Sequence, residues 1–121
     1  MIVKATREGL LWRVSASGYV IDDVVYFVAL PAKNALFRFV WVAVSGPALS
    51  VAKRVYAQVL DVGPWNVADN DYVFGGKRPQ AETGTDLFGR KTNGAGIDLG
   101  GAVHRELAIV GDNAKVMWEF I

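Results

Sequence analysis

The sequence contains no cysteine and a single histidine, His104. Without cysteine, the chain has no disulfide framework, no thiolate nucleophile and no thiolate ligand for zinc. One histidine, without clustered Asp and Glu at metal-binding spacing, does not form the pattern of a transition-metal centre. We therefore expect no metal and no cofactor.

The sequence also lacks an excess of charge of one sign and long apolar runs. The 13 basic and 12 acidic residues give a net charge of +1, which creates no field to concentrate nucleic acid or an anionic membrane surface. The longest apolar stretch, residues 36–44, contains Arg38 and is far shorter than the roughly 20 residues that span a bilayer. The first eight residues lack the apolar core of a signal peptide. We expect no nucleic-acid partner and no membrane span, and a cell-envelope or extracellular location if this is a domain of an exported protein.

Apolar and aromatic residues, by contrast, are abundant. They make up 52% and 12% of the chain, which excludes a disordered protein. A chain of 121 residues is long enough to bury a core and too short for two ordinary domains. The composition therefore predicts one domain over residues 1–121.

The periodicity along the chain is mostly that of strands. Runs rich in β-branched and aromatic residues predict strands over Trp12–Val20, Val24–Leu30, Leu36–Val44, Val51–Leu60, Ala95–Leu99 and Lys115–Phe120. The turn sequence Ser45-Gly46-Pro47 predicts that the third and fourth of these runs pair as a hairpin. A two-turn helix is expected over Gly101–Ala108. Six or seven strands with one short helix suit a closed barrel.

A loop insertion at about residues 66–94 has neither a strand nor a helix period, and in a compact domain such a loop is usually functional. It contains Asp69, Asp71 and Asp86, whose oxygens suit a hard cation such as calcium. The pair Asp69 and Asp71 lacks the rest of a calcium-loop pattern. We prefer the alternative that these carboxylates, with Arg78 or Arg90, form a network that orders the loop.

Two short motifs each carry an aspartate at the end of an apolar run. Asp61 lies in Val59-Leu60-Asp61-Val62-Gly63-Pro64-Trp65, and Asp98 lies in Gly94-Ala95-Gly96-Ile97-Asp98-Leu99. A carboxylate at the mouth of a strand is partly desolvated but reachable, which moves its pKa toward acid/base chemistry. Two alternatives stay open: Asp98 caps the following helix, and Asp61 accepts backbone N–H bonds at the Gly-Pro turn.

These motifs, together with Leu30-Pro31 upstream, resemble the paired signatures of double-psi β-barrel domains, as in the rare-lipoprotein-A-like and expansin-like proteins of bacteria. The resemblance implies a six- to seven-stranded double-psi β-barrel that binds a peptidoglycan-like polysaccharide. It also implies lytic cleavage with Asp98 and Asp61 as catalytic residues. Enzymes of the rare-lipoprotein-A-like kind carry a histidine near the Leu-Pro motif, and this chain has none there. A non-catalytic glycan-binding module and a structural or assembly domain, for example phage-encoded, remain alternatives.

Residues near the first aspartate are candidates for substrate binding. Trp65 and Tyr72 offer aromatic faces on which a sugar ring can stack, although Trp65 could equally plug the end of the barrel. Arg78, Arg90 and Asn93 could hold acidic or polar groups of the glycan.

Overall fold

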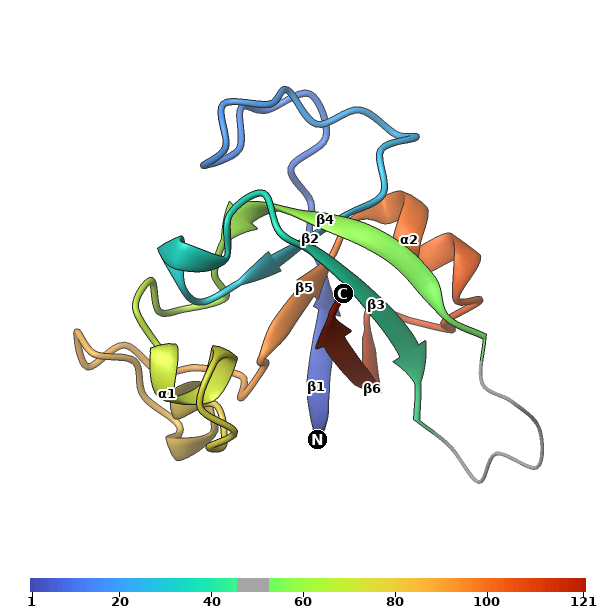
Figure 1. The fold of residues 1–121 in the computed structure, drawn as a ribbon. Coiled ribbons are helices and arrows are strands. Elements are labelled where there is room, and N and C mark those ends of the chain that lie inside the picture. The colour runs from blue at the N-terminus through green and yellow to red at the C-terminus, as the bar shows by residue number, and fades with distance from the viewer. Residues whose placement is uncertain (46–52) are drawn as a thin grey trace.

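The computed structural model describes residues 1–45 and 53–121. Within these ranges the protein is mainly β, and six strands close into a barrel (Figure 1). The strands are β1 Ile2–Arg7, β2 Phe27–Leu30, β3 Phe39–Val44, β4 Val55–Val62, β5 Ile97–Leu99 and β6 Asn113–Phe120. The described residues form only two short α-helices, α1 Asn70–Val73 and α2 Gly101–Glu106, with 3-10 turns at Lys33–Ala35 and Gln80–Thr83. None of the helices in this part of the chain is long and apolar enough to cross a membrane.

The order of strands around the barrel is β1-β5-β2-β4-β3-β6, with β6 returning to β1. Two neighbouring pairs, β1 with β5 and β2 with β4, run parallel, and the other four pairs run antiparallel. Because every strand has a neighbour on both sides, the barrel leaves no open sheet edge. The first and last strands pair with each other, so both ends of the sequence are needed to close it.

The core follows from the alternation of side chains along each strand. In β1, Val3 and Ala5 point into the barrel and are fully buried, whereas Lys4 and Thr6 lie on the outer face. A second, smaller apolar cluster of Ile21, Phe27 and Leu60 lies outside the main core. It forms where residues 8–26 fold over one end of the barrel, at the top of Figure 1.

The predicted hairpin is confirmed, because β3 and β4 pair antiparallel with Trp41 opposite Tyr56. Most of its expected turn, at Gly46 and Pro47, lies outside the described residues, as does the expected start of the second strand at Val51.

The strand expected over Trp12–Val20 is wrong, since this segment consists of turns with one isolated bridge between Val14 and Val20. A two-residue contact without a third strand has too little buried surface to form a sheet.

The long insertion contains more regular structure than its sequence indicates, namely α1 and the 3-10 turn at Gln80–Thr83. Asp86 is buried, accepts the backbone N–H groups of Phe88 and Arg90, and pairs with the Arg90 side chain. Arg78 pairs with Glu82. The prediction that carboxylates and arginines order this loop is confirmed for Asp86 with Arg90, and Asp69 accepts the N–H of Gln80, whereas Arg78 pairs with a carboxylate that the prediction did not name. The ordered loop holds one wall of the candidate site.

Candidate functional site

Strand pairing places the two aspartates in one row across the outer face of the barrel. Asp98 on β5 pairs with Thr6 on β1 and, on its other side, with Ala29 on β2. Asp61 on β4 pairs with Ala29 from the opposite edge. With about 4.8 Å between neighbouring strands, the two Asp Cα atoms lie about 10 Å apart. Strand β2 separates β4 from β5, yet both aspartates lie in the same row.

An open cavity of about 420 Å³ lies at one end of this row. One wall comes from the end of β1 and from β5, and the other comes from the residues just before the long loop and from its end. Its lining residues are Thr6, Arg7, Glu8, Gly9, Pro64, Trp65, Asn93 and Asp98. The volume falls within the roughly 300–1,000 Å³ of small-molecule sites.

The wall formed by the long loop is held by hydrogen bonds. The Trp65 indole donates to Asn93 Oδ1 at 2.9 Å, and the same oxygen accepts the N–H of Ala95 at 3.0 Å. Lys4 Nζ on β1 donates to the main-chain oxygen of Asn93 at 2.9 Å. Trp65 also has a φ of 70°, a backbone conformation that costs a non-glycine residue about 1–3 kcal/mol. The structure therefore holds the indole in place at the cavity.

Asp98 is partly buried and contacts the cavity. Burial raises the pKa of its carboxyl to about 6, the Thr6 hydroxyl opposes this by donating a hydrogen bond to it, and the charge of Asp61 raises it further. Helix α2 begins after Gly100 and has no side-chain cap. The interpretation of Asp98 as a helix cap is therefore wrong, and its carboxyl titrates close to neutral pH beside a solvent-accessible cavity.

The side chain of Asp61 is held by a hydrogen bond to a distant segment of the chain. Its Oδ1 accepts the backbone N–H of Ala16 at 2.8 Å, which ties the folded-over N-terminal segment to β4. The alternative that Asp61 accepts a backbone N–H is confirmed, although the donor belongs to a distant segment and not to the Gly63-Pro64 turn. Asp61 is not among the residues that line the cavity.

Glu8 is the acidic residue that sequence reasoning missed. Burial, then a hydrogen bond with Asp61 and the charges of Asp61 and Asp98, raise the pKa of Glu8 to about 10. Its side chain is neutral at pH 7 as a result, and within the described part of the chain its buried Oε2 has no hydrogen-bond partner. Had β1 been predicted, the alternation from Val3 and Ala5 would have placed Glu8 on the same face as Thr6.

The structure brings Trp65 and Asn93 to the cavity, with Arg90 behind them. Arg90 donates to the main-chain oxygen of Trp65 at 3.3 Å and pairs with buried Asp86. Its guanidinium therefore holds the backbone of Trp65, and Arg90 does not line the cavity.

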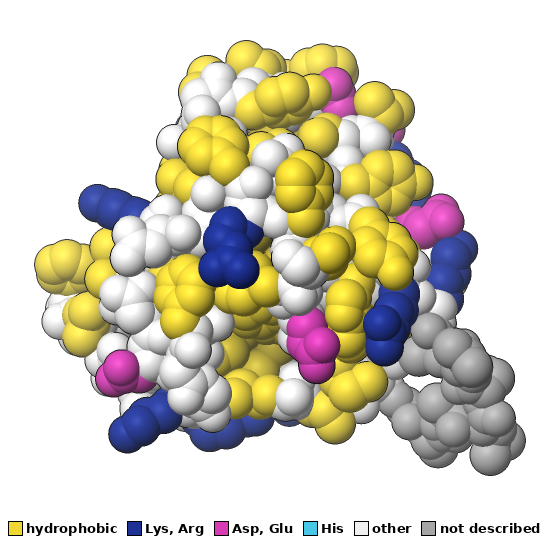
Figure 2. Space-filling view, viewed as in Figure 1, with side chains coloured by type: hydrophobic (Ala, Val, Ile, Leu, Met, Phe, Trp, Pro, Cys, Tyr) yellow, Lys and Arg dark blue, Asp and Glu magenta, His cyan; other side chains and the backbone are white. Residues whose placement is uncertain are grey.

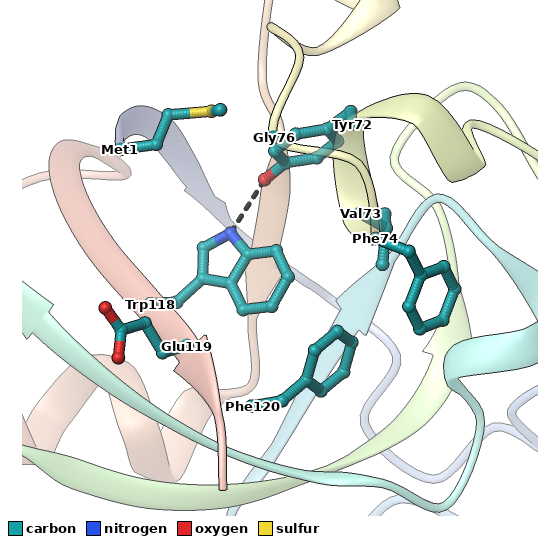
Figure 3. Close-up of a pocket in the computed structure, with 8 residues that line it drawn as sticks. All are labelled: Met1, Tyr72, Val73, Phe74, Gly76, Trp118, Glu119 and Phe120. Carbon is teal, nitrogen blue, oxygen red and sulfur yellow. Dashed lines mark hydrogen bonds between the residues drawn. The ribbon is translucent and has the colours of Figure 1, made fainter.

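Tyr72 and Arg78 lie elsewhere. Tyr72 is 3% exposed, donates to the main-chain oxygen of Gly96 and accepts the indole N–H of Trp118 at 2.7 Å (Figure 3). A tyrosine buried in this way has no free face for a sugar, so the expectation that it flanks Asp61 is wrong. Arg78 is held by Glu82 on the same loop and does not reach the carboxylates.

A second hollow lies between α1 and the end of β6, where Figure 2 shows an apolar recess. It has a volume of about 210 Å³, and aromatic rings of Tyr72, Phe74, Trp118 and Phe120 form much of its lining. Trp118 packs edge-on against Tyr72 and Phe120 (Figure 3). Glu119 is the only carboxylate in its lining, so among the cavities described here the one beside Asp98 is better suited to proton transfer.

Comparison with known families identifies the chain as a member of a domain family of unknown function, DUF8814, whose model matches residues 1–81. The match is about two-thirds of the 121 residues, and it includes Glu8, Asp61 and Trp65 but ends before Asn93 and Asp98. No curated protein matches the sequence.

Proposed function

We propose that this member of the DUF8814 family binds a peptidoglycan-like cell-wall polysaccharide in the cavity beside Asp98 and cleaves it by a lytic route. The observation that carries the proposal is the position of Asp98, a partly buried carboxyl with a pKa of about 6 that lines the same open cavity as Trp65. An indole face suits the C–H face of a sugar ring. A carboxyl that titrates near neutral pH can give and take a proton.

The lytic reaction needs two proton transfers. The bond between the anomeric carbon and the leaving oxygen breaks while that oxygen gains a proton, and a hydroxyl of the same sugar attacks the anomeric carbon and loses its proton. Asp98 serves both steps in turn, first as acid and then as base, and no water is consumed. Positive charge develops at the anomeric carbon, and the charge of Asp61, which lies in the same row but does not line the cavity, stabilises it from a distance.

The double-psi form of the barrel belongs to the same proposal. The two parallel pairs, β1 with β5 and β2 with β4, support it, as does the position of Leu30-Pro31 at the end of β2. The relation to the rare-lipoprotein-A-like and expansin-like proteins rests on the motifs around Asp61 and Asp98. The chain departs from the former at the missing histidine, so its acid/base chemistry must come from carboxyl groups.

Purified protein incubated with peptidoglycan tests the proposal. Wild-type protein should release soluble fragments whose terminal sugars are closed into anhydro rings, detected by mass spectrometry. Asp98→Asn should release none while folding normally, because the amide keeps the size of the carboxyl but cannot shuttle a proton. Asp112→Asn, at an exposed turn position, is the matched control and should retain activity. Equal product release by the Asp98 variant would refute the catalytic role.

A glycan-binding module without catalysis is distinguished by sedimentation with insoluble cell wall. Trp65→Ala should weaken binding by about 1–3 kcal/mol, the scale of one lost aromatic contact. Trp12→Ala is the matched control, because Trp12 is an exposed tryptophan with a similar φ of 64° that lies outside the cavity. Binding that depends on Trp65, with no product from wild-type protein, would support the module.

An assembly domain is the other candidate function, and one observation favours it. The segment 8–26 leaves several large apolar side chains exposed, over the top of the molecule in Figure 2. They include Leu11, Trp12, Val14, Val20 and Val24. Contiguous apolar surface of this kind often marks a protein contact. A self-assembled species that dissociates in a Trp12→Ser variant, with neither wall binding nor cleavage, would favour this function.

A further inference from the structure

The cavity is lined by two carboxyl groups, and the second of them is Glu8, not Asp61. Glu8 follows the last residue of β1 and continues its ladder, donating its N–H to the main-chain oxygen of Leu99 at 2.9 Å. Thr6 pairs with Asp98, so Glu8, two residues further along the same face, stands diagonally across from Asp98. The backbones of diagonal neighbours on adjacent strands lie about 7–8 Å apart, a spacing from which two side chains can reach the carboxyl separations of glycosidases.

Asp61 interacts with Glu8 but is not among the residues that line the cavity. One of its oxygens accepts the N–H of Ala16, and its carboxyl also forms a hydrogen bond with Glu8. A hydrogen bond between two carboxyl groups requires a proton on one of them. Asp61 is thus placed to orient the protonated side chain of Glu8, while Glu8 itself contacts the space in which a substrate would lie.

We propose that Glu8 is the catalytic acid of this site, that Asp98 is the base, and that Asp61 is a positioning residue that holds Glu8. This assignment rests on the function proposed above and replaces its single carboxyl with two. Glu8 gives its proton to the leaving oxygen as the bond to the anomeric carbon breaks. Asp98 takes the proton of the attacking hydroxyl as the new carbon–oxygen bond forms. The turnover leaves Glu8 ionised and Asp98 protonated, and transfer of that proton back to Glu8 through cavity water restores both.

The protonation states of the resting protein suit these roles. Burial and the neighbouring acids raise the pKa of Glu8 to about 10 and that of Asp98 to about 6, so at pH 7 Glu8 is an acid and Asp98 is mostly a base. Carboxyl groups whose environments separate their pKa values in this way commonly divide acid and base roles. The charged groups around Glu8 come from several elements: Asp61 on β4, Asp98 on β5, and Arg7, Asp22 and Asp23, which line a smaller adjoining cavity with Glu8.

The test compares two substrates. On peptidoglycan, Glu8→Gln should lower the rate of product release at least about 100-fold, the usual contribution of a general acid. On an aryl glycoside of the same sugar, whose phenolate leaves without protonation, Glu8→Gln should stay within about tenfold of wild type. Asp98→Asn should be inactive on both substrates. Asp61→Asn should retain partial activity and shift the basic limb of the pH profile, because it changes the partner of the Glu8 proton.

The outcomes separate this inference from the function on which it rests. If wild-type protein cleaves neither substrate, the proposed function and the acid role of Glu8 both fail. If wild type is active and Glu8→Gln is equally active on peptidoglycan, only the assignment of Glu8 fails. If Asp61→Asn shows the substrate-dependent loss and Glu8→Gln does not, the acid is Asp61. Matching amide spectra of the wild type and Glu8→Gln exclude a folding defect.

Discussion

At the residue scale, Glu8 links the stability of the fold to pH. Its pKa in the folded protein, about 10, lies above the ordinary value of 4.5. The folded state therefore holds a proton that the unfolded chain releases above pH 4.5. The stabilisation is fully present below pH 4.5 and is lost progressively as pH rises toward 10, with a slope of up to about 1.4 kcal/mol per pH unit. The raised pKa of Asp98 likewise lowers the stability of the fold as the pH rises from 3.8 to about 6.

Glu8→Gln should remove most of this dependence, because glutamine resembles the neutral acid and does not ionise. We expect the variant to melt at the same temperature as wild type at pH 4 and at a higher temperature at pH 8. Thermal unfolding between pH 4 and 9 measures the effect. Glu119→Gln, which changes an exposed carboxylate on β6, is the control. Parallel melting curves for the Glu8 variant and wild type across this range would contradict the prediction.

A second residue-scale prediction concerns the adjacent glycines at the start of α2. A Cβ on Gly100 would lie 2.4 Å from two ring carbons of Phe27 and 2.9 Å from its main-chain oxygen. Gly100→Ala should therefore destabilise the protein by about 1–3 kcal/mol through overpacking. A Cβ on Gly101 would meet nothing closer than 3.5 Å, and Gly101→Ala should stabilise helix α2 by up to about 1 kcal/mol. Urea unfolding distinguishes them, and equal midpoints would count against the close approach.

At the scale of elements, the loop of residues 66–94 positions half of the site. Trp65 immediately precedes the loop and Asn93 lies near its end, and the hydrogen bond between them at 2.9 Å closes the cavity wall. Its Asp, Gly and Pro content predicted an ordered but irregular loop, because such residues form local hydrogen-bonded turns. The sequence did not indicate which charged residue pairs with which, since that depends on how the loop folds back on itself.

Asp86→Asn should loosen this loop. The carboxylate accepts two backbone N–H groups and pairs with the guanidinium of Arg90, and the neutral amide weakens each of these bonds. We expect a lower melting temperature and faster proteolysis within residues 66–94. The control is Asp71→Asn, which changes an exposed acid of the same loop. If proteolysis of the two variants proceeds at the same rate, the Asp86 network does not hold the loop.

At the scale of the whole molecule, closure of the barrel depends on β1. This strand pairs in parallel with β5 and antiparallel with β6. Such pairing joins parts of the chain that are far apart in sequence, so it follows from the complete topology and not from a local pattern. The missed strand is also the one that leads directly into Glu8, which explains why an incomplete prediction of the fold gave an incomplete site.

Adjacent substitutions in β1 test this dependence. Val3 is 0% exposed in the core, whereas Ile2 is 45% exposed. Val3→Asp should prevent cooperative folding, because an unpaired charge in an apolar core costs several kcal/mol. Ile2→Asp should cost about 1 kcal/mol or less, the range of strand propensity at a partly exposed position. Circular dichroism and urea unfolding provide the measurement, and a folded Val3→Asp variant would show that the barrel closes without this strand.

The sequence by itself determined the β class, the hairpin of β3 and β4 and the helix that begins at Gly101. It also indicated Asp61 and Asp98 as candidate site residues. These features depend on local propensity and on side-chain periodicity, which neighbouring residues express directly. Only the tertiary structure decided that Asp98 and Glu8 line the cavity while Asp61 does not, that Tyr72 is buried, and that Trp65 meets Asn93. Those facts depend on which strands become neighbours and on the burial that follows, and burial is what sets the pKa of a carboxyl group.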